Sequence, residues 1–324
     1  MPADPIYSLA TAAKAIGTLW AAYQAYKLAS FLHLHFIRRS TLKRYLKTSP
    51  SGEPAWALVT GSTDGIGRGF AEELCEHGFN IILHGRNPEK LEIEKQKLLA
   101  RWPKRLIQTL CIDATAETGN AQRLEQAAID LKALNIRVLI NNVGGTGGMP
   151  AFCPLHDRTS EEARIFIDMN LRFPTEITRV LLPQLRHNTP SLILNVSSAT
   201  ADFGLPYLSV YSGAKAYNRS WSRCLTSEMK ADNLDVEVMA LVVSAVATDN
   251  YAKPQGLFVP NARKFAKAAL GVVGCGRSVV YPYWGHRVQS FMFDVMPTRM
   301  AESMIVDVGR KEKADEEKLK GKRE

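Results

Sequence analysis

Tyr211 and Lys215, a tyrosine and a lysine four residues apart, are the residues best suited to acid–base chemistry in this sequence. On a helix the two side chains share one face. A phenol with a pKa of about 10 transfers protons poorly at neutral pH, but a neighbouring ammonium stabilises the phenolate and lowers that pKa. Tyr23 and Lys27 have the same spacing, so spacing alone identifies no site. Ser198 distinguishes the first pair, because it ends an apolar run before Tyr211 and can direct a hydroxyl to the same substrate oxygen.

A glycine-rich turn forms the second motif. Residues 60–67 read TGSTDGIG and follow the first strand-like run of the chain. Glycines here allow a tight turn and bring the backbone close to a pyrophosphate, while the next helix directs its first N–H groups toward the negative charge. We expect this turn to bind a dinucleotide, with a plain strand-to-helix turn as the alternative. The residues expected to bind are Gly61, Ser62, Thr63, Asp64, Gly65, Ile66 and Gly67.

Arg86 follows the second strand-like run and bears on the choice of dinucleotide. An acidic residue near this point would bind the ribose 2′-hydroxyl of NAD, whereas arginine suits the 2′-phosphate of NADP through charge-assisted hydrogen bonds. We therefore predict NADP(H) as the cofactor, with a surface arginine that binds no ligand as the alternative. The other glycine run, residues 144–148, lacks the Lys-Ser/Thr ending of a phosphate loop and indicates a flexible loop.

Seven short apolar runs rich in β-branched residues alternate with longer helix-like segments. The predicted strands are residues 55–60, 80–84, 106–112, 138–141, 191–196, 236–243 and 278–281. The predicted helices include residues 67–77, 88–101, 121–132, 161–185 and 214–229. This alternation predicts an α/β fold with a doubly wound, Rossmann-like parallel sheet of about seven strands. Ligands bind beyond the carboxyl ends of such strands, which is where the motifs lie.

The formal net charge of +9 is concentrated at the two ends of the chain. Residues 1–50 carry seven Lys or Arg and one Asp, and residues 310–324 carry seven basic and five acidic residues, so the centre is close to neutral. The centre lacks the basic stripe with aromatic side chains that a nucleic-acid surface needs. The five cysteines form no CxxC pair and the seven histidines no HExxH motif, so neither a disulfide framework nor a metal site is indicated.

Residues 6–37 are rich in apolar and aromatic residues but contain Lys14, Gln24 and Lys27, and are barely apolar enough to cross a bilayer. Five basic residues follow within residues 38–47, and such a cluster is typical of the cytosolic side and attracts anionic lipid. We expect a membrane-associated helix that spans the bilayer or lies in its interface, with a helix packed on the domain as the alternative. Residues 320–324, KGKRE, resemble the retrieval signal of endoplasmic-reticulum membrane proteins, although a charged tail can match it by chance.

These patterns divide the chain into four parts. We expect a hydrophobic anchor and basic linker over residues 1–50, a single NADP-binding domain over residues 51–282, an apolar extension over residues 283–309 and a charged tail over residues 310–324. Within the domain, residues 249–261 contain Pro254, Gly256 and Pro260, and this composition favours a mobile substrate lid.

Taken together, the glycine turn, Asn141 to Gly144, Ser198, Tyr211 and Lys215 resemble the short-chain dehydrogenase/reductase superfamily in order and spacing. The resemblance covers roughly residues 54–281. It implies that Tyr211 is the general acid in reduction and that Ser198 polarises the substrate carbonyl. It also implies that Lys215 lowers the tyrosine pKa and holds the nicotinamide ribose.

The same resemblance assigns roles to five further residues. Asn170 would support a water-linked proton relay, and Asp113 would contact the adenine. Asn142 and Gly144 would bind the cofactor after the fourth strand, and Thr248 would lie near the nicotinamide carboxamide.

Within the superfamily the chain looks like the membrane-bound group of 17β-hydroxysteroid dehydrogenase type 12 and very-long-chain 3-oxoacyl-CoA reductase. This implies NADPH-dependent reduction of a long-chain 3-oxoacyl-CoA in fatty-acid elongation, at the endoplasmic-reticulum membrane with the catalytic domain facing the cytosol. A lipid-like substrate would explain the anchor, and a homodimer or an elongation-complex partner is possible. A steroid or secondary-metabolite ketone is the alternative substrate, and a cofactor-binding scaffold without turnover is the alternative class of protein.

Overall fold

The computed structural model of the chain describes residues 5–116, 120–249, 251 and 253–320. Its centre is one seven-stranded sheet in the order β3-β2-β1-β4-β5-β6-β7, and every neighbouring pair is parallel. The strands are β1 (Ala55–Val59), β2 (Asn80–Gly85), β3 (Ile107–Cys111), β4 (Asn135–Asn141), β5 (Ser191–Ser198), β6 (Val236–Val243) and β7 (Val279–Val280). The predicted strands are therefore confirmed, although β4 begins earlier than expected and β7 is only two residues long.

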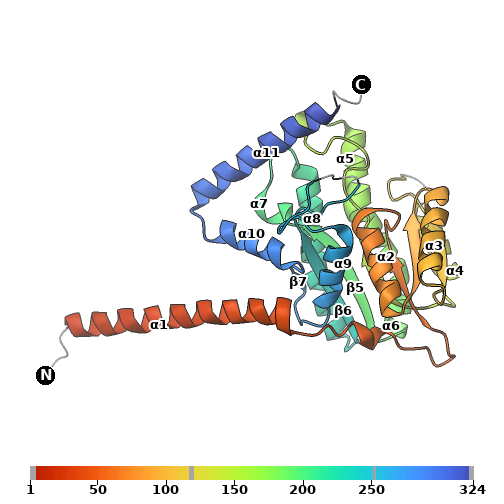
Figure 1. Cartoon of the computed structure of the whole chain (residues 1–324), viewed down its shortest axis with the longest axis horizontal. Helices are drawn as coiled ribbons and strands as arrows, with labels where there is room; N and C mark the ends of the chain where they lie inside the picture. The colour runs from red at the N-terminus through yellow and green to blue at the C-terminus, as the bar shows by residue number, and fades with distance from the viewer. Residues whose placement is uncertain (1–4, 117–119, 250, 252, 321–324) are drawn as a thin grey trace.

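Helices cover both faces of the sheet (Figure 1). One buried cluster joins the sheet to α2 (Gly65–His77), α3 (Pro88–Arg101) and α9 (Ala262–Gly271). The other joins it to α4 (Asn120–Asp130), α6 (Phe173–His187) and α8 (Ser209–Ala231). Apolar side chains fill both clusters, as expected when helices lie on both sides of a parallel sheet. The predicted doubly wound, single-domain fold is thus confirmed.

The long helix predicted over residues 161–185 is interrupted. It consists of α5 (Ser160–Ile167), a π-helical turn (Asp168–Arg172) and α6. Pro174 gives the physical reason, because in a regular helix its missing N–H would have bonded the carbonyl of Asn170. The side-chain amide of Asn218 on α8 donates to that freed carbonyl at 3.2 Å instead. Such turns often lie at functional sites.

The amino-terminal helix α1 (Pro5–Leu32) extends away from the sheet (Figure 1). Large apolar and aromatic side chains are exposed along it, among them Leu19, Trp20 and Tyr26. Within the described residues, no helix combines the length and the apolar character needed to cross a membrane. The basic segment after α1 is packed on the domain, because the Arg38 guanidinium donates to Val273 and the buried Tyr45 hydroxyl donates to Glu237.

Two helices complete the chain, α10 (Trp284–Asp294) and α11 (Thr298–Lys320). The charged tail expected from residue 310 is continuous with the second of them, up to residue 320. Residues 321–324, which hold most of the retrieval-like motif, lie outside the described residues. The segment expected to be a lid has no regular element in its described part, apart from two isolated bridges that involve Thr248 and Asn261. Short turns of helix, α7 (Thr200–Phe203) and a 3₁₀ turn (Leu155–Asp157), lie in other loops at the same edge.

Candidate active site

The glycine turn joins β1 to α2 at the carboxyl edge of the sheet. Gly61 and Gly65 have φ angles of +62° and +53°, which L side chains rarely adopt. At Gly67 a Cβ would lie 2.5 Å from the amide nitrogen of Asn142 and would overlap the Gly61 carbonyl. Asp64 caps α2 by accepting a 2.5 Å hydrogen bond from the Gly65 N–H. The turn is therefore a close-packed backbone cradle at a helix amino terminus, which fits a dinucleotide phosphate.

The residues around this turn differ in their surroundings. Ser62 is fully buried, and its hydroxyl is bonded to the backbone of His84, so its side chain shapes the turn. Thr63 and Asp64 are half-buried, and Ile66 packs on the core. Thr60, which the motif did not single out, accepts hydrogen bonds from the N–H groups of residues 142 and 143 at 2.9 Å each. It fastens the glycine turn to the end of β4.

Arg86 follows β2 and Asp113 follows β3, and these two strands are neighbours in the sheet. Arg86 is exposed, and the described residues provide no ion-pair partner for it. Asp113 accepts two hydrogen bonds from Thr115, at 3.0 Å from the backbone and 2.8 Å from the hydroxyl. Asp113 thus orders the start of its own loop, and Arg86 is available to an anion.

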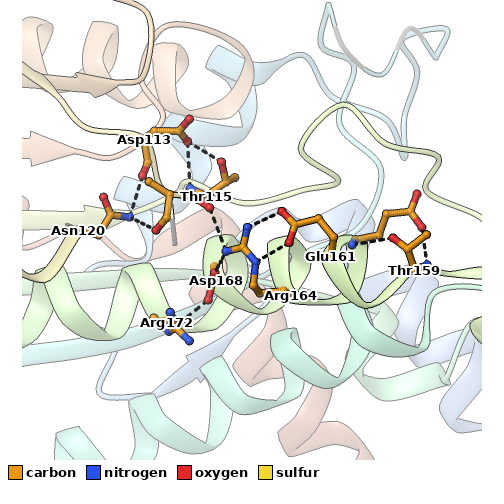
Figure 2. Close-up of polar contacts among 10 residues, drawn as sticks. Asp113, Thr115, Asn120, Thr159, Glu161, Arg164, Asp168 and Arg172 are labelled. Atoms are coloured by element: carbon orange, nitrogen blue, oxygen red, sulfur yellow. Dashed lines mark hydrogen bonds and ion pairs between the residues drawn. The ribbon is translucent and has the colours of Figure 1, made fainter. Parts of the chain in front are cut away.

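Arg164 joins that loop to the helix that carries Asn170 (Figure 2). Its guanidinium donates to the Thr115 carbonyl at 3.4 Å and to the buried Asp168 carboxylate at 2.6 Å. Arg172 approaches the other oxygen of Asp168 at 3.2 Å, and Glu161 holds Arg164 from the opposite side. This network links the predicted adenine side of the site to the π-helical turn.

Helix α8 and the ends of β4 and β5 bring the predicted acid–base residues together. The Lys215 ammonium is buried, donates to the Val196 carbonyl at 3.0 Å and lies 5.6 Å from the centre of the Tyr211 ring. A Cβ at Gly144 would lie 2.8 Å from the Asn170 side-chain oxygen and 2.9 Å from the Lys215 nitrogen. Only a glycine fits between these two polar groups. Ser198, at the end of β5, lies within hydrogen-bonding reach of Tyr211.

Burial has the largest effect on the pKa values of Tyr211 and Lys215. It raises the pKa of Tyr211, while the hydrogen bond with Ser198 acts in the opposite direction. Burial also lowers the pKa of Lys215 to about 8. The expectation that Lys215 lowers the pKa of Tyr211 stays a prediction, because in this structure the Lys215 ammonium donates to the Val196 carbonyl and burial is the largest influence on the Tyr211 pKa.

Comparison with known proteins bears on this geometry. The family model described as short chain dehydrogenase matches residues 55–255. The chain belongs to the short-chain dehydrogenase family. It is 31% identical over 312 residues to a very-long-chain 3-oxoacyl-CoA reductase of Neurospora crassa, covering 91% of this chain and 90% of that protein. It is 34% identical to a very-long-chain 3-oxoacyl-CoA reductase-like protein of Arabidopsis thaliana, covering 79% and 81%.

Solved structures agree with the fold of a short-chain dehydrogenase. A short-chain dehydrogenase of Sphingobium yanoikuyae in complex with NADPH superposes with a TM-score of 0.62 at 22% identity, covering 74% of this chain and 92% of that one. In this family member, Thr248 extends from the end of β6 to the glycine turn, where its methyl group would lie 3.3 Å from a Cβ on Gly65. Thr248, which the resemblance assigns to the carboxamide, therefore lies close to the glycine turn.

Two residues that support the site of this short-chain dehydrogenase were not predicted from its sequence. Asn218 binds the Asn170 carbonyl, and Arg219 donates to the Ser198 carbonyl at 2.5 Å and pairs with Asp202. Arg219 is buried and fixes the end of β5 where Ser198 lies. The spacing could have identified Arg219, because it lies four residues after Lys215 and so on the same face of the helix as Tyr211 and Lys215.

The buried Lys215 should make stability depend on pH. Its pKa falls from 10.5 to about 8 on folding, so between these values the unfolded chain holds a proton that the folded chain has released. The free energy of unfolding should therefore rise with pH across this window, by about 2–3 kcal/mol relative to Lys215→Met. Urea unfolding at fixed ionic strength measures this. Lys132→Met, at an exposed position, should keep the rise, and a pH-independent difference between wild type and Lys215→Met would contradict the prediction.

Proposed function

We propose that this protein reduces a long-chain 3-oxoacyl-CoA to the 3-hydroxyacyl-CoA with NADPH. The observation that carries the proposal is the meeting of Tyr211, Ser198, Lys215 and Asn170 at the carboxyl edge of the sheet, beside the glycine turn. The substrate class is supported by the relatives named very-long-chain 3-oxoacyl-CoA reductase, which align over most of both chains. The reaction fits fatty-acid elongation at the endoplasmic reticulum.

The residues that would hold the cofactor line one half of the carboxyl edge. The turn at residues 61–67 would bind the pyrophosphate, Arg86 the 2′-phosphate and Asp113 the adenine. Asn142 and Gly144 would lie along the ribose and nicotinamide, with Thr248 at the carboxamide. Bound NADPH supplies the hydride.

Tyr211 would donate the proton that the substrate oxygen needs as its carbon is reduced. The phenol is protonated at neutral pH and can act as the acid, and the nearby Lys215 ammonium would offset the rise that burial causes in its pKa. The Ser198 hydroxyl oxygen accepts hydrogen bonds from the Thr200 N–H at 3.2 Å and the Thr200 hydroxyl at 3.0 Å, so its own proton can bond either the Tyr211 oxygen or a substrate oxygen beside it. That hydrogen bond would polarise the carbonyl and stabilise the developing negative charge.

Lys215 would provide positive charge and hydrogen bonds on the cofactor side. An ammonium has three N–H donors, and Val196 accepts one of them. The other two are available to ribose hydroxyls. With a pKa of about 8 the side chain is largely protonated at neutral pH, and the charge also favours transfer of the Tyr211 proton.

We also propose that α1 attaches the protein to the cytosolic face of a membrane by lying in the lipid interface. Exposed Trp20, Tyr23 and Tyr26 support this, because aromatic side chains favour the headgroup region. The exposed Arg39, Lys43 and Lys47, which follow α1, would contact anionic headgroups. A substrate with a long acyl chain would partition into the same layer.

Tyr211→Phe tests the reaction. Loss of the general acid should lower kcat on 3-oxoacyl-CoA substrates by about 10²- to 10⁴-fold, with NADPH binding retained. NADPH oxidation by wild type should rise with acyl-chain length. Tyr23→Phe, which alters the other Tyr-x-x-x-Lys pair, should match wild type. A wild type that binds NADPH but turns over no acyl-CoA would redirect the proposal to steroid or secondary-metabolite ketones.

Arg86→Asp tests the cofactor. Removal of the guanidinium takes away a charge-assisted bond to the 2′-phosphate, so the Kd for NADPH should rise by about 10- to 100-fold. Binding of NADH should improve, since an acidic residue can accept from the 2′-hydroxyl. Titration of cofactor fluorescence measures both constants. Arg123→Asp, another exposed arginine, is the control, and an unchanged NADPH affinity for Arg86→Asp would remove Arg86 from the site.

Vesicle flotation tests the membrane proposal. The wild type should float with vesicles of phosphatidylcholine and phosphatidylserine, and Leu19→Glu combined with Trp20→Glu should lower the bound fraction by about tenfold or more, because two charges enter the apolar layer. Gln24→Glu on the same helix serves as a control for added charge. Equal flotation of all three proteins would argue against an interfacial role for α1.

A further inference from the structure

Helix α11 lies across the carboxyl edge of the sheet, above the loops that leave it (Figure 1). Its less exposed side is apolar near the start, at Ala301, Ile305 and Gly309, and charged toward the end, at residues 312, 313 and 316. Residues 309–316 contact the loops that follow β4, β5 and β6. All three loops leave the carboxyl edge on the side of the sheet that carries Ser198.

Glu316 binds the loop after β4. Its two carboxylate oxygens accept hydrogen bonds from the backbone N–H groups of Ala151 at 2.7 Å and Phe152 at 2.9 Å. Hydrogen bonds to a carboxylate are about twice as strong as neutral ones. One side chain from residue 316 thus fixes two successive peptide groups of a loop more than 160 residues away.

The middle of α11 packs on the segment that leads into the Tyr211 helix. Gly309 lies against Pro206, where a Cβ would come within 2.9 Å of the proline ring. The Lys313 ammonium lies 5.1 Å from the centre of the Tyr207 ring. Tyr207 has a φ of +69°, a conformation that non-glycine residues rarely adopt, and its carbonyl accepts a hydrogen bond from the Cys153 N–H. The segment at residues 206–207 therefore joins the loop after β4 to α11.

Glu312 binds the loop after β6, which the sequence predicted to be a lid. Its carboxylate pairs with the Lys253 ammonium at 2.6 Å, and both side chains are largely shielded from water, with 21% and 32% exposed. The Lys253 nitrogen also lies 5.3 Å from the centre of the Tyr251 ring. The lid segment is thereby tied to α11 by a partly desolvated ion pair.

From these contacts we propose that α11 is a clamp for the substrate-binding loops, with Glu316 and Glu312 as positioning residues that determine the affinity for the ketone substrate. The inference rests on the proposed function. Among the described residues, the side-chain hydrogen bonds and ion pairs between α11 and the rest of the chain reach the loops after β4 and β6. The charged end of the chain therefore helps to hold the loops beside the proposed active site.

Glu316→Gln in the full-length protein tests the first contact. The glutamine side chain keeps the shape but loses the charge and one acceptor, so the KM for 3-oxoacyl-CoA should rise by about tenfold, with kcat changed less than about twofold. The Kd for NADPH should stay at the wild-type value. Hydrogen exchange at residues 151–152 should be about tenfold faster. Glu302→Gln, on the exposed side of the same helix, is the matched control and should change none of these.

Charge reversal tests the second contact. Lys253→Glu and Glu312→Lys should each raise the KM, because each places like charges together, and the double reversal should restore it to within about threefold of wild type. Failure of the double variant to recover, while it binds NADPH normally, would overturn the ion pair as a positioning contact. If Glu316→Gln kept the wild-type rate of hydrogen exchange at residues 151–152 and the wild-type KM, the clamp would be overturned.

The exchange measurement separates this inference from the proposed function. A wild type that reduces no 3-oxoacyl-CoA overturns the proposed substrate, yet faster exchange at residues 151–152 in Glu316→Gln would still establish the clamp. A parallel fall in melting temperature, NADPH affinity and turnover in Glu316→Gln would show a general structural role and would count against positioning.

Discussion

The parallel pairing of β1 with β4 is the constraint on which the site depends. The strand order reverses between these two strands, and in open α/β sheets ligands bind beyond the carboxyl ends at such a point. Here the two loops that leave it are bonded to each other, because the Asn142 amide donates to the carbonyls of Thr60 and Gly61 at 2.9 and 3.1 Å. Every other part of the site, from Arg86 on one side to the α8 residues on the other, is positioned relative to this junction.

Sequence patterns predicted the sheet and most of the site because the relevant information is local. β-branched runs specified six strands closely, and motifs at strand ends specified Tyr211 and the glycine turn. The early start of β4 was missed because Arg137 made the segment look polar. In the structure this buried guanidinium donates to the carbonyls of Asn188 and Thr189, at 3.0 and 2.9 Å, so its polarity is compatible with a central strand.

What the sequence did not predict depends on partners far apart in the chain. Pro174 was a visible signal for the break at Asn170, but the hydrogen bond that Asn218 donates to the freed carbonyl depends on the fold. The acidic residues near the carboxyl end were interpreted as a solvated tail. Their partners are backbone N–H groups and one lysine in loops far away along the chain, and no local pattern marks such contacts.

The buried ammonium of Lys215 shows how this fold accepts a local loss of stability at its site. A charge without a counter-ion is costly in an apolar setting, and one carbonyl oxygen compensates it only in part. A methionine of similar length would pack there more favourably. The arrangement is physically reasonable if a ligand accepts hydrogen bonds from the remaining N–H donors, since ribose hydroxyls would replace part of the solvation that folding removed. The same reasoning explains why Gly144 must leave the space beside Lys215 open, because a side chain there would displace the ammonium.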